Sequence, residues 1–210
     1  MPTAVIGESR TVVDQVRWET YLALVGDRPG NVPQITYDRG LMELMSPRKL
    51  HEKIKSLISR MVATYSEVSG IEIESVASTT FQRADLERGF EADEAYYIEH
   101  ANLMRAKDEI DLAVDPAPDL VIEVEITSSA VRKLELFAAM KVGEVWRYNG
   151  DQLTIFHLVG DRYQPSDHSL ALPGFPVPAA EHVLSQRLIR GESELISEFR
   201  STLEAVEPEA

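Results

Sequence analysis

The segment DLVIEVEIT, residues 119–127, constrains the fold of this chain more than any other. Its Ile and Val content is typical of a β-strand, on which side chains alternate between two faces. One face carries the apolar side chains Leu120, Ile122, Val124 and Ile126. The other face carries Val121 and three acids, which are Asp119, Glu123 and Glu125. A strand this apolar is expected in the interior of a sheet, with its acids facing a cleft or another packed layer.

Acids in such a place need partners. Burying an unpaired carboxylate costs several kcal/mol, so a buried acid is expected to bind a cation or several hydrogen-bond donors. The alternative is an edge strand whose acidic face is exposed to water, which is the usual environment of acids. The pattern of this one segment leaves both interpretations open.

The neighbouring segments favour the interpretation in which these acids belong to a functional site. Upstream, GFEADEAYYI places Asp93 in a second apolar and aromatic strand. Downstream, residues 127–129 offer capping hydroxyls, and Lys133 falls near the first turn of the next helix. Strand carboxylates with a lysine at a strand–helix junction predict a hard-metal site with oxygen ligands. Phosphodiester hydrolysis uses such a set, because Mg²⁺ activates water and a lysine ammonium stabilises charge on phosphate.

The rest of the pattern predicts a mixed sheet with helices packed on it. Hydrophobic periodicity predicts helices over residues 11–24, 50–68, 101–105, 131–140, 180–188 and 192–203. Strands are expected over residues 34–38, 41–45, 71–82, 92–99, 144–148 and 153–158. We expect one domain over residues 11–190, followed by a C-terminal helix and acidic tail over 191–210.

Composition narrows the classes of function. The chain has no cysteine, which excludes disulfides, thiolate metal sites and a cysteine nucleophile. No apolar run approaches the roughly 20 residues of a membrane span, and MPTAVIGESR lacks the features of a signal peptide, so a cytoplasmic protein is expected. The formal net charge of −14 argues against broad attraction to phosphate. A local basic rim could come from Arg83, Arg88, Lys133 and Lys141.

Several motifs together resemble a known family. GFEADEAYYI, PDLVIEVEITSS, the lysine that follows and KVGEVWRYNG are similar to the Uma-two family of restriction-endonuclease-like proteins, within the PD-(D/E)XK nuclease superfamily. GLMELMSP followed by His51 resembles the N-terminal signature of that family. The resemblance covers roughly residues 12–188.

The resemblance implies an α/β (α+β) fold of the restriction-endonuclease type. A four-stranded mixed core sheet would be flanked by helices, with an N-terminal helix and hairpin and with C-terminal helices. It also implies a metal-dependent endonuclease that cleaves DNA with Mg²⁺, which Mn²⁺ could replace. A homodimer is expected by analogy with nucleases that cut two strands.

The family motif carries over residue by residue. Asp93 matches the first acid and Glu123 the second, and both are expected to be catalytic and to bind metal. Asp119 matches a frequent family acid and is expected as a third metal ligand. Lys133 stands for the motif lysine, because the usual lysine position two residues after the second acid holds Glu125, itself a catalytic candidate. The superfamily proline before the first acid is replaced by Ala92.

Other interpretations remain open. His51 or Glu52 could complete the site as an acid or base, or His51 could be a structural residue at the start of a helix. The departure at Glu125 also allows a catalytically inactive nuclease-fold domain that acts as an oligomeric interaction module. Metal-free hydrolysis by paired carboxylates, as in glycosidases, would need an aromatic-lined cleft, which an aromatic content of 7% does little to support.

Overall fold

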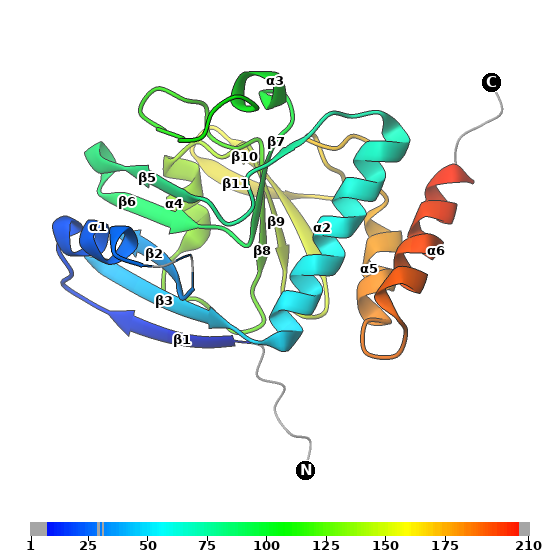
Figure 1. Cartoon of the computed structure of the whole chain (residues 1–210), viewed down its shortest axis with the longest axis horizontal. Helices are drawn as coiled ribbons and strands as arrows, with labels where there is room; N and C mark the ends of the chain where they lie inside the picture. Colours follow the sequence, from blue (N-terminus) through cyan, green and yellow to red (C-terminus); the bar gives the residue numbers. More distant parts are fainter. Residues whose placement is uncertain (1–7, 29, 31, 206–210) are drawn as a thin grey trace, which may run out of the picture.

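The computed structural model describes residues 8–28, residue 30 and residues 32–205. Over this range the chain forms two β-sheets and six α-helices (Figure 1). The five-stranded sheet has the order β1 (Glu8–Val13), β3 (Leu41–Pro47), β2 (Gln34–Asp38), β6 (Arg88–Glu91) and β5 (Thr80–Arg83). The six-stranded sheet has the order β11 (Arg162–Ser166), β10 (Leu153–Val159), β9 (Glu144–Tyr148), β8 (Leu120–Val124), β7 (Glu94–Tyr97) and β4 (Glu74–Ser75).

The helices lie around these sheets. They are α1 (Trp18–Gly26), α2 (Lys49–Ser69), α3 (Ala101–Met104), α4 (Lys133–Ala139), α5 (Val177–Ser185) and α6 (Glu192–Glu204). The long helix α2 stands beside the six-stranded sheet, with α5 and α6 next to it, while α1 lies on the five-stranded sheet (Figure 1). Within the described residues, none of the helices has the length and apolar character needed to cross a bilayer. The predicted mixed α/β class is confirmed.

Strand β8 lies inside the six-stranded sheet, between β7 and β9. It runs parallel to β9 and antiparallel to β7. All five of its residues are buried, with Ile122 in the core that contains α2 and Val121 in the core on the other face. The predicted interior strand with two different faces is therefore confirmed, and the edge-strand alternative is wrong.

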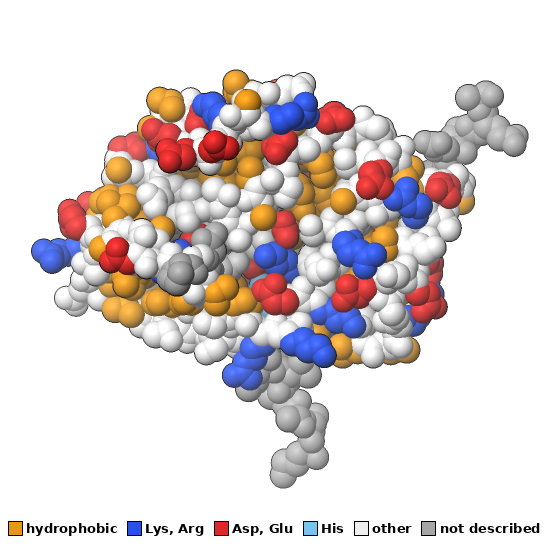
Figure 2. All heavy atoms as spheres, in the orientation of Figure 1, with side chains coloured by type: hydrophobic (Ala, Val, Ile, Leu, Met, Phe, Trp, Pro, Cys, Tyr) orange, Lys and Arg blue, Asp and Glu red, His pale blue; other side chains and the backbone are white. Residues whose placement is uncertain are grey.

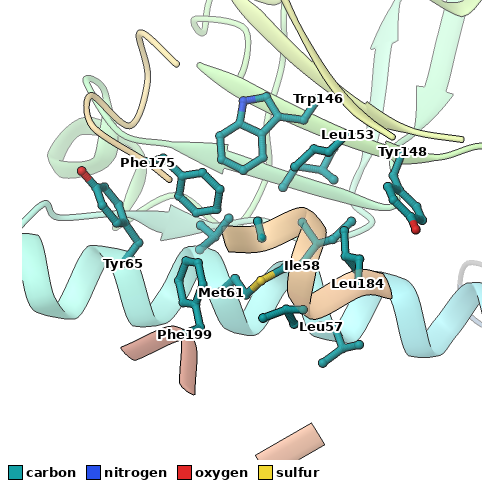
Figure 3. Packing of buried hydrophobic residues seen from close by; sticks show 14 of the residues in the cluster. Leu57, Ile58, Met61, Tyr65, Trp146, Tyr148, Leu153, Phe175, Leu184 and Phe199 are labelled. Atoms are coloured by element: carbon teal, nitrogen blue, oxygen red, sulfur yellow. The ribbon is translucent and has the colours of Figure 1, made fainter. Parts of the chain in front are cut away.

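The larger core fills the space between the sheet and helices α2, α5 and α6 (Figure 3). Met61 of α2, Trp146 of β9 and Phe199 of α6 are among its buried side chains. The Trp146 and Phe175 ring centroids lie 4.5 Å apart. Gly70 ends α2 in the left-handed conformation with φ of 64°, which glycine adopts without steric cost.

A second core joins the two sheets. Phe81 and Phe90 of the five-stranded sheet stack with centroids 5.0 Å apart, and Phe137 of α4 meets Phe90 edge-on at 4.7 Å. Val121 and Val145 of the six-stranded sheet belong to the same cluster. The chain passes from β6 of one sheet to β7 of the other through only two residues, which places this link between the sheets.

The structure corrects several predicted boundaries. The N-terminal helix begins at Trp18, because residues 8–13 form β1 and pair with β3; its Thr and Val residues are β-branched and suit a strand. The predicted strand over 71–82 is β4 and β5, which belong to different sheets. The core sheet has six strands rather than four, since β11 and β4 extend its edges.

The second set of corrections concerns the site region and the C-terminus. Asp93 precedes β7 instead of lying within a strand, and α4 begins at Lys133, two residues later than predicted. Helix α6 packs against α2 and contributes to the larger core. Residues 206–210 of the predicted acidic tail lie outside the described residues.

Because α6 contributes to the larger core, Phe199→Ala should lower the free energy of unfolding by about 3–5 kcal/mol, since this side chain is 1% exposed. Urea denaturation measures this value. Arg200→Ala is the control: its exposed ion pair with Glu67 should contribute less than about 1 kcal/mol. Equal small effects of both changes would mean that α6 is an appendage.

Candidate active site

Five parts of the chain meet at the C-terminal end of β8 or at the loop that follows it. They are the link between β6 and β7, the first turn of α2, the start of α4 and strands β1 and β3. Each contributes a buried or nearly buried charged side chain to the end of β8 or to the loop that follows it. This convergence is what brings together residues that are distant in sequence.

Asp93 lies in the link between the two sheets and is 1% exposed. Its Oδ2 accepts a hydrogen bond from the Val124 backbone N–H at 2.7 Å, and its Oδ1 accepts one from Gln34 Nε2 at 3.1 Å. Burial raises the pKa of Asp93, but the His51 ring and the Lys133 ammonium outweigh burial, so this pKa lies below its ordinary value. Asp93 is therefore a fixed, ionised carboxylate.

His51, on the first turn of α2, is fully buried. Its Nε2 lies 3.1 Å from the Val124 carbonyl oxygen, 3.2 Å from Asp93 Oδ2 and 3.6 Å from Glu8 Oε2. Burial lowers the pKa of His51, but the Asp93, Glu8 and Glu52 carboxylates raise it above the ordinary value. Three acceptors surround Nε2, so this nitrogen carries a proton. The geometry favours the structural interpretation of His51, which ties α2 to β8.

Glu123 and Lys133 form a buried ion pair on the face of β8 opposite α2. Lys133 Nζ donates to Glu123 Oε2, and the two side chains are 9% and 4% exposed. The other oxygen, Glu123 Oε1, is buried without a hydrogen-bond partner. Burial raises the pKa of Glu123, and the Asp93 charge adds to this effect while Lys133 opposes it. Burial lowers the pKa of Lys133, but the Glu123 and Asp93 carboxylates more than compensate. The net effect raises the pKa of Glu123 to about 7, and without the Lys133 ammonium beside it this pKa would be higher still.

Two buried acids of the five-stranded sheet hold the loop between β8 and α4. Glu8 Oε1 accepts hydrogen bonds from the Thr127 N–H at 2.9 Å and the Thr127 hydroxyl at 2.7 Å. Glu43 accepts from the Ser129 hydroxyl and from the Ala130 N–H, both at 2.8 Å. The loop that leads into Lys133 is therefore fixed by side chains from another sheet.

Arg10 of β1 joins these two acids. It donates to Glu8 Oε1 from Nε at 3.1 Å and from Nη2 at 2.9 Å, and its Nη1 donates to Glu43. We call Glu8, Arg10 and Glu43 the carboxylate clamp. The shared guanidinium compensates both buried negative charges, which would otherwise be costly.

Sequence reasoning missed the clamp. Glu43 carries a detectable signal, because an acid inside the apolar strand LMELM is the same pattern that marks Glu123. Glu8 and Arg10 carry none, since their strand was not predicted and their partners lie far away in sequence.

A cavity of about 280 Å³ lies beside the ion pair. Its polar and charged lining residues are Glu123, Glu125, Ser129, Arg132, Lys133, Glu135 and Arg147. Glu125 Oε1 accepts a hydrogen bond from the Ser129 N–H at 2.8 Å, and its Oε2 lies 4.0 Å from Arg147 Nη1. Glu125 therefore both anchors the loop and faces the cavity.

Asp119 lies apart from this cluster, just before β8 at the opposite end of the strand. Its Oδ2 accepts a hydrogen bond from the Ile98 N–H at 2.6 Å, and its Oδ1 lies 2.9 Å from His100 Nδ1. Oxygen or nitrogen atoms of Glu99, His100 and Asp119 come within 4.8 Å of one another, the only such triple of His or acidic side chains in the described part of the chain. The structure thus separates Asp119 from the other two predicted metal ligands.

A family model identifies the family to which the chain belongs. The family model of Uma2, described as "Putative restriction endonuclease", matches residues 18–188. The chain belongs to the Uma2 family. This is the Uma-two family that the sequence motifs resemble, and the match covers Asp93, Glu123 and Lys133, whereas Glu8 and Arg10 precede it.

A solved structure shares the fold of this Uma2 chain. It is described as a "putative nuclease belonging to DUF820" from Anabaena variabilis, with 15% sequence identity and a TM-score of 0.52. The alignment covers 88% of this chain and 99% of the other. No curated protein matches the sequence significantly.

Removing the cation of the carboxylate clamp should destabilise the folded protein. Arg10→Met leaves two buried carboxylates uncompensated, so we expect the free energy of unfolding to fall by about 3–5 kcal/mol, as measured by urea denaturation. Adding Glu8→Gln and Glu43→Gln should recover part of the loss, because the unpaired charges disappear.

The exposed pair of Arg39 with Asp38 supplies the control, since Arg39→Met should cost less than about 1 kcal/mol. An Arg10→Met protein as stable as this control would show that the clamp does not stabilise the loop.

Proposed function

We propose that this Uma2 chain is a divalent-metal-dependent endonuclease that hydrolyses phosphodiester bonds of DNA. The observation that carries the proposal is the convergence of Asp93, Glu123 and Lys133 at the end of an interior strand, with a cavity beside them. Membership of a family described as restriction endonucleases supports the same reaction class.

The residues present fit a hard divalent cation. Glu123 Oε1 is a buried carboxylate oxygen without a hydrogen-bond partner, and Asp93 is held ionised close by. Both donors are carboxylate oxygens, which suit Mg²⁺ or Mn²⁺. Mg²⁺ keeps several of its waters and needs only one or two carboxylates from a protein, so the distant Asp119 is not required.

The chain's own groups have separate tasks in this proposal. Asp93 and Glu123 would hold the cation, which when bound polarises a phosphoryl oxygen and lowers the pKa of a bound water. Lys133 lines the cavity and would stabilise negative charge that develops on the phosphate. His51 keeps Asp93 oriented, and Glu125 keeps the loop in place through Ser129. The buried surroundings strengthen each of these electrostatic interactions.

The second candidate is a catalytically inactive nuclease-fold domain that acts as an oligomeric interaction module. The direct Glu123–Lys133 ion pair favours it, because Lys133 compensates one of the two carboxylates without a metal. Titration with Mn²⁺ separates the candidates. Absence of binding at millimolar Mn²⁺ would favour the inactive domain.

The central test is a cleavage screen over single-stranded, duplex and structured DNA and RNA, with Mg²⁺, Mn²⁺ or EDTA. We expect cleavage of DNA only with metal, and its loss in Asp93→Ala, Glu123→Ala and Lys133→Ala. A metal ion at 100 times its Kd should also stabilise the wild-type fold by about 2.7 kcal/mol, seen as a higher Tm.

Asp119→Asn is the matched control, since this carboxylate lies at the other end of β8. It should retain cleavage and the metal-induced rise in Tm. Retained cleavage in Glu123→Ala would contradict the proposed site. An equal loss of cleavage in Asp119→Asn would indicate that the metal binds at the other end of the strand.

We further propose a homodimer. Strand β1 forms an edge of its sheet, with Val12 and Val13 46% and 40% exposed, and such edges pair readily with another strand. Sedimentation at micromolar concentration should show a dimer, and Val12→Lys with Val13→Lys should convert it to a monomer. A wild-type monomer would contradict the proposal.

A further inference from the structure

The start of α2 differs in charge from the rest of the chain. Residues 48–60, RKLHEKIKSLISR, contain five Lys or Arg and one Glu, whereas the whole chain carries a formal charge of −14. Figure 2 shows Lys and Arg side chains gathered over the N-terminal part of α2. The positive charge is therefore local.

Three of these cations are free of ion pairs. Arg48 and Lys49 are exposed and Lys53 is half-buried, and none of them forms an ion pair with a residue in the described part of the chain. By contrast, Lys55 lies 4.0 Å from Glu94 and Arg60 lies 3.6 Å from Glu192. We call Arg48, Lys49 and Lys53 the α2 basic patch.

The four residues of the basic rim that the sequence suggested differ from this patch, because three of them already form ion pairs within the protein. Arg83 pairs with Asp85, Arg88 pairs with Asp38, and Lys133 is buried against Glu123. Lys141 follows the far end of α4 and lines a different cavity.

The α2 basic patch adjoins the candidate active site. His51, in the same turn of α2, contacts Asp93 and the carbonyl of Val124. Beyond the end of β8, Arg132 and Arg147 line the cavity that contains Glu123. Cations thus lie both at the start of α2 and along the cavity, and within the described residues those of the α2 basic patch form no ion pair.

The patch has the geometry of a site for a linear polyanion. Lys49 and Lys53 are four residues apart on a helix, which separates them by about 6 Å along its axis. Each strand of a DNA duplex presents a phosphate about every 3.4 Å along the helix axis, so a row of cations can meet a row of phosphates.

We propose that the α2 basic patch binds backbone phosphates of a nucleic-acid strand, next to the phosphodiester that is cleaved. The position of the strand rests on the proposed function, whereas binding itself does not. The contact is with phosphate, so it should be independent of base sequence and strongly dependent on salt.

The test is fluorescence anisotropy with labelled single-stranded and duplex DNA in EDTA, where cleavage is absent. The variant combines Arg48→Ala, Lys49→Ala and Lys53→Ala. We expect at least about tenfold weaker binding at 0.1 M salt, and a slope of log K against log salt smaller by about 1 for each lost contact with duplex DNA.

The matched control is Arg105→Ala, Lys141→Ala and Arg162→Ala, which removes the same charge from parts of the chain outside α2. It should keep nearly the wild-type slope, and thermal unfolding should show that both triple variants are folded. Three outcomes would contradict the proposal that the α2 basic patch binds phosphates. They are equal weakening of binding in the two variants, an unchanged salt slope in the patch variant, and no DNA binding by the wild type at low salt.

Cleavage assays separate this inference from the proposed function. If DNA binding depends on the patch but no metal-dependent cleavage is seen, the result would support phosphate binding by the α2 basic patch and contradict the proposed nuclease activity. If metal-dependent cleavage has the same kcat/KM in the wild type and the patch variant, the result would support the nuclease activity and contradict a role of the α2 basic patch in binding the substrate.

Discussion

Compensation of buried charge at the end of β8 is the constraint on which the site depends. Arg10 is shared between Glu8 and Glu43, and these two acids hold the loop that leads into Lys133. Lys133 in turn compensates Glu123. Each charge is stable in its buried place only because the next one is present, so the two sheets and the start of α4 are fixed relative to one another.

This arrangement gives the two candidate metal ligands different properties. Asp93 is surrounded by hydrogen-bond donors and has a lowered pKa, whereas burial raises the pKa of Glu123, which has one oxygen without a partner. A rigid anion beside a carboxylate that gains from an added cation is a suitable environment for a divalent metal. The same electrostatics explain why His51 works best as a positioning group, since its Nε2 proton lies among three acceptors.

The formal charge of −14 is compatible with a nucleic-acid substrate because charge is unevenly placed. Buried acids such as Glu8, Glu43 and Glu123 are compensated inside the protein and contribute little to the field outside. The cations of the α2 basic patch, which form no ion pair within the described residues, lie at the start of α2, next to the His51 that contacts Asp93. A local patch of this kind supports attraction that falls steeply with salt.

The sequence by itself predicted strand β8, the face on which Glu123 lies, and Asp93 and Lys133 as candidate site residues, but it left open whether the strand lies inside the sheet or at its edge. Alternation along a strand is a local property, so it can be read from consecutive residues. Only the tertiary structure decided that Glu8 and Arg10 reach the same site and that Asp119 does not. Which acid meets which cation depends on strand pairing and on the packing of two sheets, and these join segments more than 80 residues apart, such as Glu43 and Ala130.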